Sequence, residues 1–104
     1  MKIFRKIKVL VSFRRRHLPF VKSLEDLDIL WEVGLHQEAG TPITLKILFL
    51  RGIGSVATIQ RRLTRLKRLG VVHQSRAPHD KRLVRLTLDP ALLLKFNRLF
   101  VLFR

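Results

Sequence analysis

The residues best suited to recognising another molecule lie between Ser55 and Gly70, in a segment that carries no acid. Arg61 can donate two parallel hydrogen bonds to a guanine, and Gln60 can bond to an adenine in a similar bidentate way. Ala57 leaves space for the methyl group of a thymine. Side chains of these types on one surface indicate contact with the edges of base pairs.

The apolar spacing in this segment predicts a helix that carries those side chains on its outer face. Ile59, Leu63 and Leu66 recur at i, i+4 and i+7, with Val56 beside them, so they form one apolar stripe. Ser55 can cap the start of the helix and Gly70 can end it. At about 100° per residue, the residues opposite the stripe are Ala57, Arg61, Thr64 and Arg68, with Arg65 close by. The residues expected to face only solvent or phosphate are Arg62, Lys67 and Arg68.

A basic β-hairpin is predicted after this helix. The segment VVHQSR leads into a turn at residues 77–80, and the segment RLVRLTL then alternates apolar with polar residues. Before the helix, residues 44–51 predict a short apolar helix that is either deeply buried or covered by a second subunit. The glycine-containing turn at residues 52–54 joins the two helices. A short helix, a tight turn, a basic helix and a basic hairpin indicate a winged helix-turn-helix.

Charge is the strongest compositional feature of the 104-residue chain. Twenty-two Lys and Arg residues against seven Asp and Glu give a net charge of +15. Residues 1–22 carry +8 and residues 51–88 carry +9, whereas residues 23–50 carry −4. This distribution implies a polyanionic partner, with nucleic acid first and an anionic membrane surface second.

Other chemistries find no support in the residues. The chain has no cysteine, which excludes disulfides and thiolate metal sites. Its four histidines are scattered, and no catalytic triad, carboxylate pair or phosphate-binding glycine loop is present. We therefore expect no enzyme activity and no cofactor or metal. No apolar run approaches the roughly 18–20 residues of a membrane span. With nucleic acid as the first partner, we expect a cytoplasmic, nucleoid-associated protein.

The length of the chain predicts one domain, mostly α with a small β-hairpin wing, of about five helices and two to three short strands. Its parts are a basic amino-terminal helix or arm (residues 1–22), a winged helix core (23–88) and a carboxy-terminal helix (89–104). The core begins with a helix capped at Ser23, in which Trp31 is expected to anchor the interior. Its predicted buried stripe is Leu24, Leu27, Leu30, Trp31 and Leu35.

The two ends of the chain predict a contact with another subunit. Residues 1–16 favour a helix over a strand, with Ile3, Ile7, Leu10 and Val11 on one face. Three roles remain open for it: a packing or dimerisation helix, a basic arm on phosphate, or an amphipathic membrane or targeting segment. The final helix, starting at Pro90, carries more apolar residues than one solvent-facing helix needs. This surplus favours a homodimer.

A family likeness rests on spaced residues between Thr44 and Pro90. They are Thr44, then Ser55-x-x-Thr58-Ile59, Leu66-x-x-x-Gly70-Val71-Val72, Asp80-Lys81-Arg82 and Leu86-Thr87. In this order and spacing the chain resembles the MarR-type winged-helix transcription regulators of bacteria and archaea.

The resemblance implies a homodimer on a pseudo-palindromic double-stranded DNA site, with the recognition helices in the major groove and a wing arginine in the minor groove. By position that arginine is Arg82, and Asp80 stabilises the wing. The short terminal segments argue against a small-molecule effector. The alternatives are a winged helix that binds RNA or protein, and a membrane-surface protein that uses residues 1–16. The predicted DNA-binding residues are Ser55, Ala57, Thr58, Gln60, Arg61, Arg65, Arg76, His79, Lys81 and Arg82.

Overall fold

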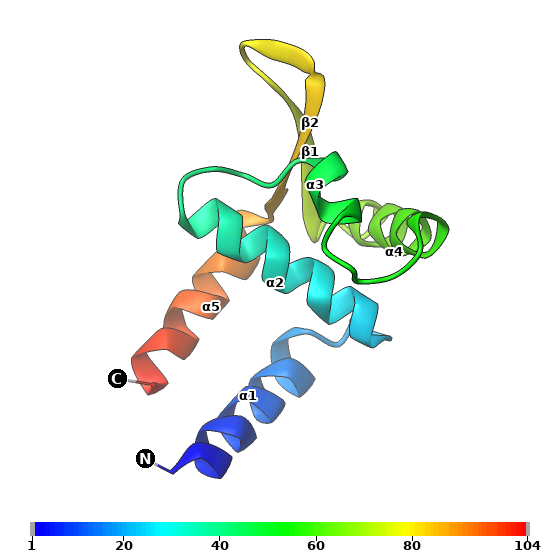
Figure 1. The fold of residues 1–104 in the computed structure, drawn as a ribbon. Helices are drawn as coiled ribbons and strands as arrows, with labels where there is room; N and C mark the ends of the chain where they lie inside the picture. The colour runs from blue at the N-terminus through cyan, green and yellow to red at the C-terminus, as the bar shows by residue number, and fades with distance from the viewer. Residues whose placement is uncertain (1, 104) are drawn as a thin grey trace. The chain divides into compact units, whose positions relative to one another are not determined.

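A computed structural model describes residues 2–103 as five helices and one antiparallel two-stranded sheet, the architecture of a winged helix-turn-helix (Figure 1). The predicted fold class is confirmed. A single bridge between Thr44 and Arg85 stands where a third strand would lie. Met1 and Arg104, which the predicted terminal segments include, lie outside the described residues. The elements are α1 (Ile3–His17), α2 (Leu24–Glu38), α3 (Leu45–Phe49), α4 (Val56–Arg68), β1 (Val72–Ala77), β2 (Asp80–Leu88) and α5 (Pro90–Leu102).

The chain divides into two compact units. The winged unit spans residues 23–89 and holds α2, α3, α4 and the hairpin, while the helical unit joins residues 1–22 to residues 90–104 and holds α1 and α5. In the winged unit the predicted stripe of α4 is confirmed at Ile59, Leu63 and Leu66, which are all buried, whereas Val56 at the start of the helix is exposed. Val72 of β1 and Leu86 of β2 are buried as well.

The helix α4 begins and ends where the sequence indicates. Ser55 is its N-cap and its Oγ accepts a hydrogen bond from the Thr58 amide at 3.1 Å. Gly70 follows the last turn with φ +74°, a left-handed conformation that favours glycine. The Val71 amide then donates to the Leu66 carbonyl oxygen at 3.0 Å, which closes the carboxyl end of the helix. Both ends of α4 are therefore fixed by local hydrogen bonds.

Helix α2 is rotated relative to the predicted stripe. Its buried residues are Asp26, Ile29, Leu30 and Val33. The prediction that Trp31 anchors the core was wrong, since Trp31 is 45% exposed, and Leu24 and Leu35 are also exposed. The rotation turns Asp26 inward, and at the other end of the helix Gln37 Oε1 accepts the Leu88 amide at 2.8 Å. Contacts to α4 and β2 thus set the rotation of α2.

Helix α3 is shorter than the predicted helix over residues 44–51. Thr44 caps it through a hydrogen bond from the Ile47 amide to Oγ1 at 3.2 Å. Leu48 is its buried residue, whereas Leu50 lies just beyond it and is exposed. Deep burial of this segment, one of the two predicted outcomes, is therefore wrong for the single chain. The other outcome, cover by a second subunit, stays a prediction.

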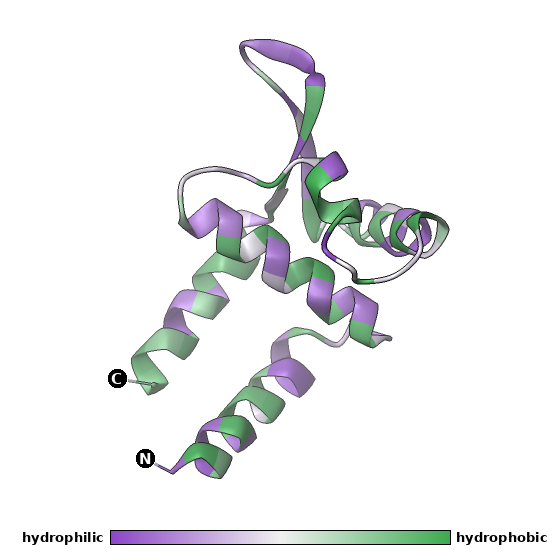
Figure 2. Ribbon diagram, in the orientation of Figure 1, coloured by the Kyte–Doolittle hydropathy of each residue, from purple (hydrophilic) through white to green (hydrophobic). Residues whose placement is uncertain are grey.

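In the helical unit, residues 3–17 form a helix and not a strand, as favoured from the sequence. Phe13 is buried and its ring lies 5.0 Å from that of Phe96 on α5. The predicted apolar face of α1 is not buried with Phe13, because its members Ile3 and Ile7 are exposed. The neighbouring Phe4 is 76% exposed. Figure 2 shows hydrophobic and hydrophilic residues mixed along α1, whereas the tip of the hairpin is hydrophilic.

A bidentate ion pair between Asp26 and Arg62 joins α2 to α4 inside the winged unit. The side chain of Asp26 is 0% exposed, and its two carboxylate oxygens accept hydrogen bonds from Nε and Nη2 of Arg62. The Nε–Oδ1 distance is 2.8 Å. This hydrogen-bonded carboxylate is the main reason why the pKa of Arg62 lies above its ordinary value. A bidentate pair of this kind fixes both distance and orientation between the two helices.

We predict that Arg62→Ala lowers the free energy of unfolding by about 3 kcal/mol, because it leaves a buried carboxylate without its bidentate partner. Urea unfolding followed by far-UV circular dichroism measures the loss. The matched control is Arg68→Ala, which removes an exposed arginine from the same helix and should change stability by at most about 0.5 kcal/mol. Equal effects of the two substitutions would contradict the proposed importance of the pair.

Candidate nucleic-acid interface

The amino-terminal turn of α4 holds three of the predicted DNA-binding residues in one hydrogen-bonded group. Ser55 Oγ donates to Thr58 Oγ1 at 3.0 Å, and Arg61 Nη2 donates to the same oxygen at 3.3 Å. The Thr58 hydroxyl is thus shared between the helix cap and a guanidinium group. This arrangement draws Arg61 towards the start of the helix, the part that contacts base edges in helix-turn-helix proteins.

The outer face of α4 forms an open hollow of about 400 Å³. Four of the predicted contacts line it, namely Ala57, Gln60, Arg61 and Arg65. Thr64 and Arg68 complete the lining, so the hollow contains three guanidinium groups and no acid. Ala57 and Thr64 are the smallest side chains of the lining, and their size leaves room for the edge of a flat ligand such as a base pair.

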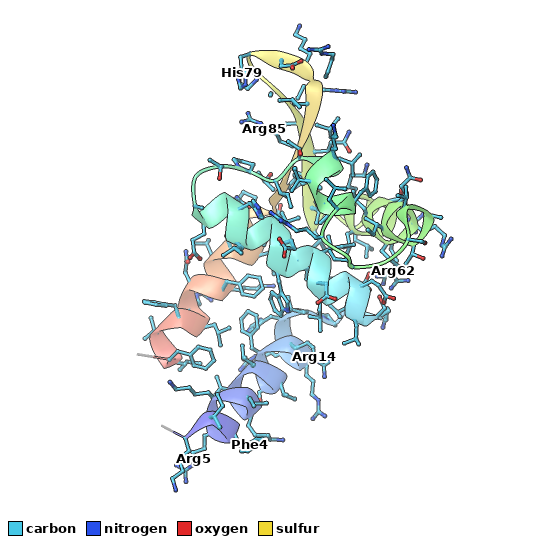
Figure 3. All side chains as sticks on the ribbon, viewed as in Figure 1. Phe4, Arg5, Arg14, Arg62, His79 and Arg85 are labelled. Atoms are coloured by element: carbon cyan, nitrogen blue, oxygen red, sulfur yellow. The ribbon has the colours of Figure 1, made fainter. Side chains whose placement is uncertain are left out.

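Two basic residues of α4 make side-chain contacts within the winged unit that the sequence does not predict. Arg62 was expected to lie on a solvated or phosphate-facing surface, and that expectation was wrong because the buried Asp26 draws it inward (Figure 3). Lys67 Nζ donates to Gln74 Oε1 on β1 at 2.8 Å, which ties the end of α4 to the wing. Arg65 both approaches the buried Asp26 and faces outwards. Its Nη1 is 3.7 Å from Asp26 Oδ2, and it also lines the outer hollow.

The wing is a hairpin whose tip is almost entirely polar. Strand β1 pairs with β2 from Val72 opposite Leu88 to Arg76 opposite Val84, and a register shift follows at Arg76 and Ala77. The turn occupies residues 78–79, within the predicted 77–80 segment. Figure 3 shows His79 at the tip. Across the hairpin, Arg76 Nη1 donates to the carbonyl oxygen of Lys81 at 3.0 Å, so two of the predicted contacts hold each other.

Asp80 organises the end of the wing. Its Oδ1 accepts the backbone N–H of Arg82 at 3.0 Å and the Arg82 Nε at 3.2 Å. These bonds, the side-chain one first, hold the pKa of Asp80 below its ordinary value, so the carboxylate stays charged. The side chain of Arg82 remains 91% exposed. The turn therefore presents a guanidinium group to solvent in a defined place.

The histidine at the base of the wing is held by a contact within the winged unit. His73 Nε2 lies 2.8 Å from Asp89 Oδ1, at the base of the wing and away from its tip. No three His or acidic side chains within residues 2–103 gather into a metal-binding group. Across the same residues, no helix combines the length and apolar character needed to cross a bilayer.

The one site residue that sequence reasoning missed is Asp26. Acids in the first turn of a helix are explained by the helix dipole and the Ser23 cap, and Glu25 and Asp26 are indistinguishable on that basis. The available indication was spacing. A carboxylate at i is buried together with apolar residues at i+3, i+4 and i+7, which matches Asp26 with Ile29, Leu30 and Val33.

Comparison with known proteins finds relatives in structure but not in sequence. No protein-family model and no curated protein matches the chain. MepR from S. aureus, in a substituted form, superimposes with a TM-score of 0.65 at 16% identity, over 97% of this chain and 74% of MepR. The chain has the MarR fold. The resemblance drawn from the spaced residues is confirmed at the level of the fold.

Two further structures with this fold contain DNA. Streptococcus pneumoniae FabT in complex with DNA gives a TM-score of 0.63 at 23% identity, over 97% of this chain and 68% of FabT. A mutant of E. coli MarR complexed with operator DNA gives 0.58 at 20% identity, over 95% of this chain and 76% of that one. These likenesses establish the fold.

We predict that Arg61→Ala costs about 1–3 kcal/mol of binding to a specific duplex and much less on a scrambled one. The reason is that a bidentate contact to guanine discriminates between bases, whereas a phosphate contact does not. Fluorescence anisotropy titrations on both duplexes measure the difference. Arg15→Ala, which removes an exposed charge from α1, is the control. Equal weakening of Arg61→Ala on both duplexes would make Arg61 a phosphate contact.

Proposed function

We propose that this chain is a sequence-specific double-stranded DNA-binding transcription regulator. The observation that carries the proposal is the acid-free outer face of α4, which presents Arg61, Arg65 and Arg68 beside an exposed basic wing. Support comes from the fold, because FabT and MarR share it in structures with DNA. The concentration of charge on α4 and the wing is what a reader of a polyanion requires.

In this proposal α4 enters the major groove. An α-helix with its side chains is about 10–12 Å across, and the major groove is about 12 Å wide. The amino-terminal half of α4 would read base edges through Ala57, Gln60 and Arg61. Ser55 and Thr58 are held in the cap, so their proposed contribution is contact with a neighbouring phosphate or base through hydroxyl groups already in place.

The wing reaches the adjacent minor groove in this proposal. A narrow minor groove concentrates negative potential and attracts arginine, and Arg82 is the exposed arginine that Asp80 holds at the hairpin end. His79 and Lys81 lie beside it in the turn region and would contact phosphates, with Arg76 bracing Lys81 from the opposite strand. Asp80 thus acts as the wing-stabilising residue without touching DNA.

A homodimer through the terminal helices completes the proposed regulator. Large apolar side chains of the helical unit are exposed, among them Phe4 at 76% and Phe100 at 62%. Phe13 of the same unit is buried. A two-fold partner would cover such surface and would place two recognition helices on a pseudo-palindromic site. We propose a cytoplasmic, nucleoid-associated location for it. The proposal needs no cofactor, enzyme activity or small-molecule effector.

The test is a selection of random duplex DNA on the purified full chain. The expected result is an inverted repeat whose half-sites lie about 10–11 base pairs apart, the spacing of one helical turn. Binding to the selected duplex should weaken linearly in log–log form as salt rises, because phosphate contacts release counterions. The selected sequence is decisive, since salt dependence alone reports only charge. No enrichment, with RNA bound equally well or better, would overturn the proposal.

A further inference from the structure

We infer that Asp26 is a positioning residue for sequence discrimination: its buried carboxylate orients Arg65 at the edge of the base-reading face of α4. The inference rests on the proposed function. It assigns a role in specificity to a residue that lies on α2, inside the winged unit, and has no exposed surface with which to touch DNA.

The buried carboxylate of Asp26 contacts two arginines of α4 that reach the surface. Arg62 occupies both carboxylate oxygens through two hydrogen bonds. Arg65 approaches the same carboxylate from the next turn of α4, with Nη1 at 3.7 Å from Oδ2. Both arginine side chains are 26% exposed, whereas the Asp26 side chain is 0% exposed. One buried negative charge therefore holds two partly exposed positive charges.

The helix geometry explains why only one of the two arginines can also reach DNA. At about 100° per residue, Arg62 lies roughly 70° from the centre of the buried stripe, Arg65 roughly 130° and Arg61 roughly 165°. Arg62 is on the flank that faces α2. Arg65 is on the border, so it lines the outer hollow together with Arg61 and still reaches Asp26.

The ion pair limits the orientations of a long side chain before DNA arrives. An arginine that is already held in place loses less conformational entropy on binding, and it meets a chosen base edge in preference to any nearby phosphate. Without the carboxylate, Arg65 would be free to follow the phosphate backbone. Affinity for any duplex would then rise with the extra net positive charge, while preference for one sequence would fall.

The test compares affinities of the full chain for the selected duplex and for a scrambled duplex at one salt concentration. For Asp26→Asn the expected ratio of the two affinities falls at least about tenfold, with binding to scrambled DNA unchanged or tighter. Asp28→Asn is the control, because Asp28 is exposed on the same helix and loses the same charge. Its ratio should equal that of the unsubstituted chain.

A second variant keeps the net charge constant and protects the fold. Asp26→Leu combined with Arg62→Met removes one charge of each sign and replaces a buried pair with apolar groups, an exchange that proteins often tolerate without loss of stability. Arg65 remains present but lacks its carboxylate. The expected result is unchanged binding to scrambled DNA and a ratio again lowered by at least about tenfold. This variant decides the question if Asp26→Asn fails to fold.

Each outcome distinguishes this inference from the proposed function. A ratio that is unchanged in the double variant, or equal losses on both duplexes, would overturn the positioning role, because a merely structural role weakens all binding alike. A chain that selects no DNA sequence contradicts the proposed function, and this inference with it. A chain that selects a sequence and keeps its ratio in the variants contradicts this inference alone.

Discussion

The arrangement of the winged unit depends on the ion pair between Asp26 and Arg62. A carboxylate with no solvent exposure is costly to bury unless it is fully paired, and α4 supplies a guanidinium group in bidentate geometry. The pair does more than connect two helices, because it adds to the buried stripe in holding the rotation of α4, and that rotation determines which residues remain outside. With Arg62 turned inward, Gln60, Arg61 and Arg65 are left on the surface that we assign to DNA.

The recognition helix and the wing follow the same physical logic of local constraint. Ser55 caps α4 and donates a hydrogen bond to the Thr58 hydroxyl, which also accepts one from Arg61. The residues that cap the helix therefore also hold the side chain of Arg61. In the wing, Asp80 accepts both the backbone and the side chain of Arg82. In each case short polar side chains fix the backbone and accept a hydrogen bond from the guanidinium group of an arginine. Such preorganisation lowers the entropy cost of binding.

Local patterns explain how much could be predicted from the sequence. The stripe of Ile59, Leu63 and Leu66, the stop at Gly70 and the turn near His79 are all determined by neighbours in the chain, so periodicity and turn chemistry identified them. The outer face of α4 followed from the stripe. The assignment of individual residues to base, phosphate or wing contacts remains a prediction, because it depends on a partner.

The wrong predictions, such as a buried Trp31 and a solvent-facing Arg62, arise because tertiary contacts decide these positions. Trp31 fits an apolar stripe of α2, yet the helix is rotated by contacts to α4 and β2 that no local pattern contains. Arg62 has the composition of a surface residue, and only the distant Asp26, 36 residues away in sequence, turns it inward. Exposed side chains such as Leu50 belong to a third class, since a second subunit would change their environment.

The central claim is that α4 reads the major groove while the wing enters the minor groove of the same duplex. Dimethyl sulfate protection on a selected duplex tests it directly, because the reagent methylates guanine N7 in the major groove and adenine N3 in the minor groove. We expect two clusters of protected guanines about 10–11 base pairs apart, with protected adenines beside them that become reactive again in Arg82→Ala. Complex formation without protection in either groove would show that only the phosphate backbone is bound, and would contradict the account.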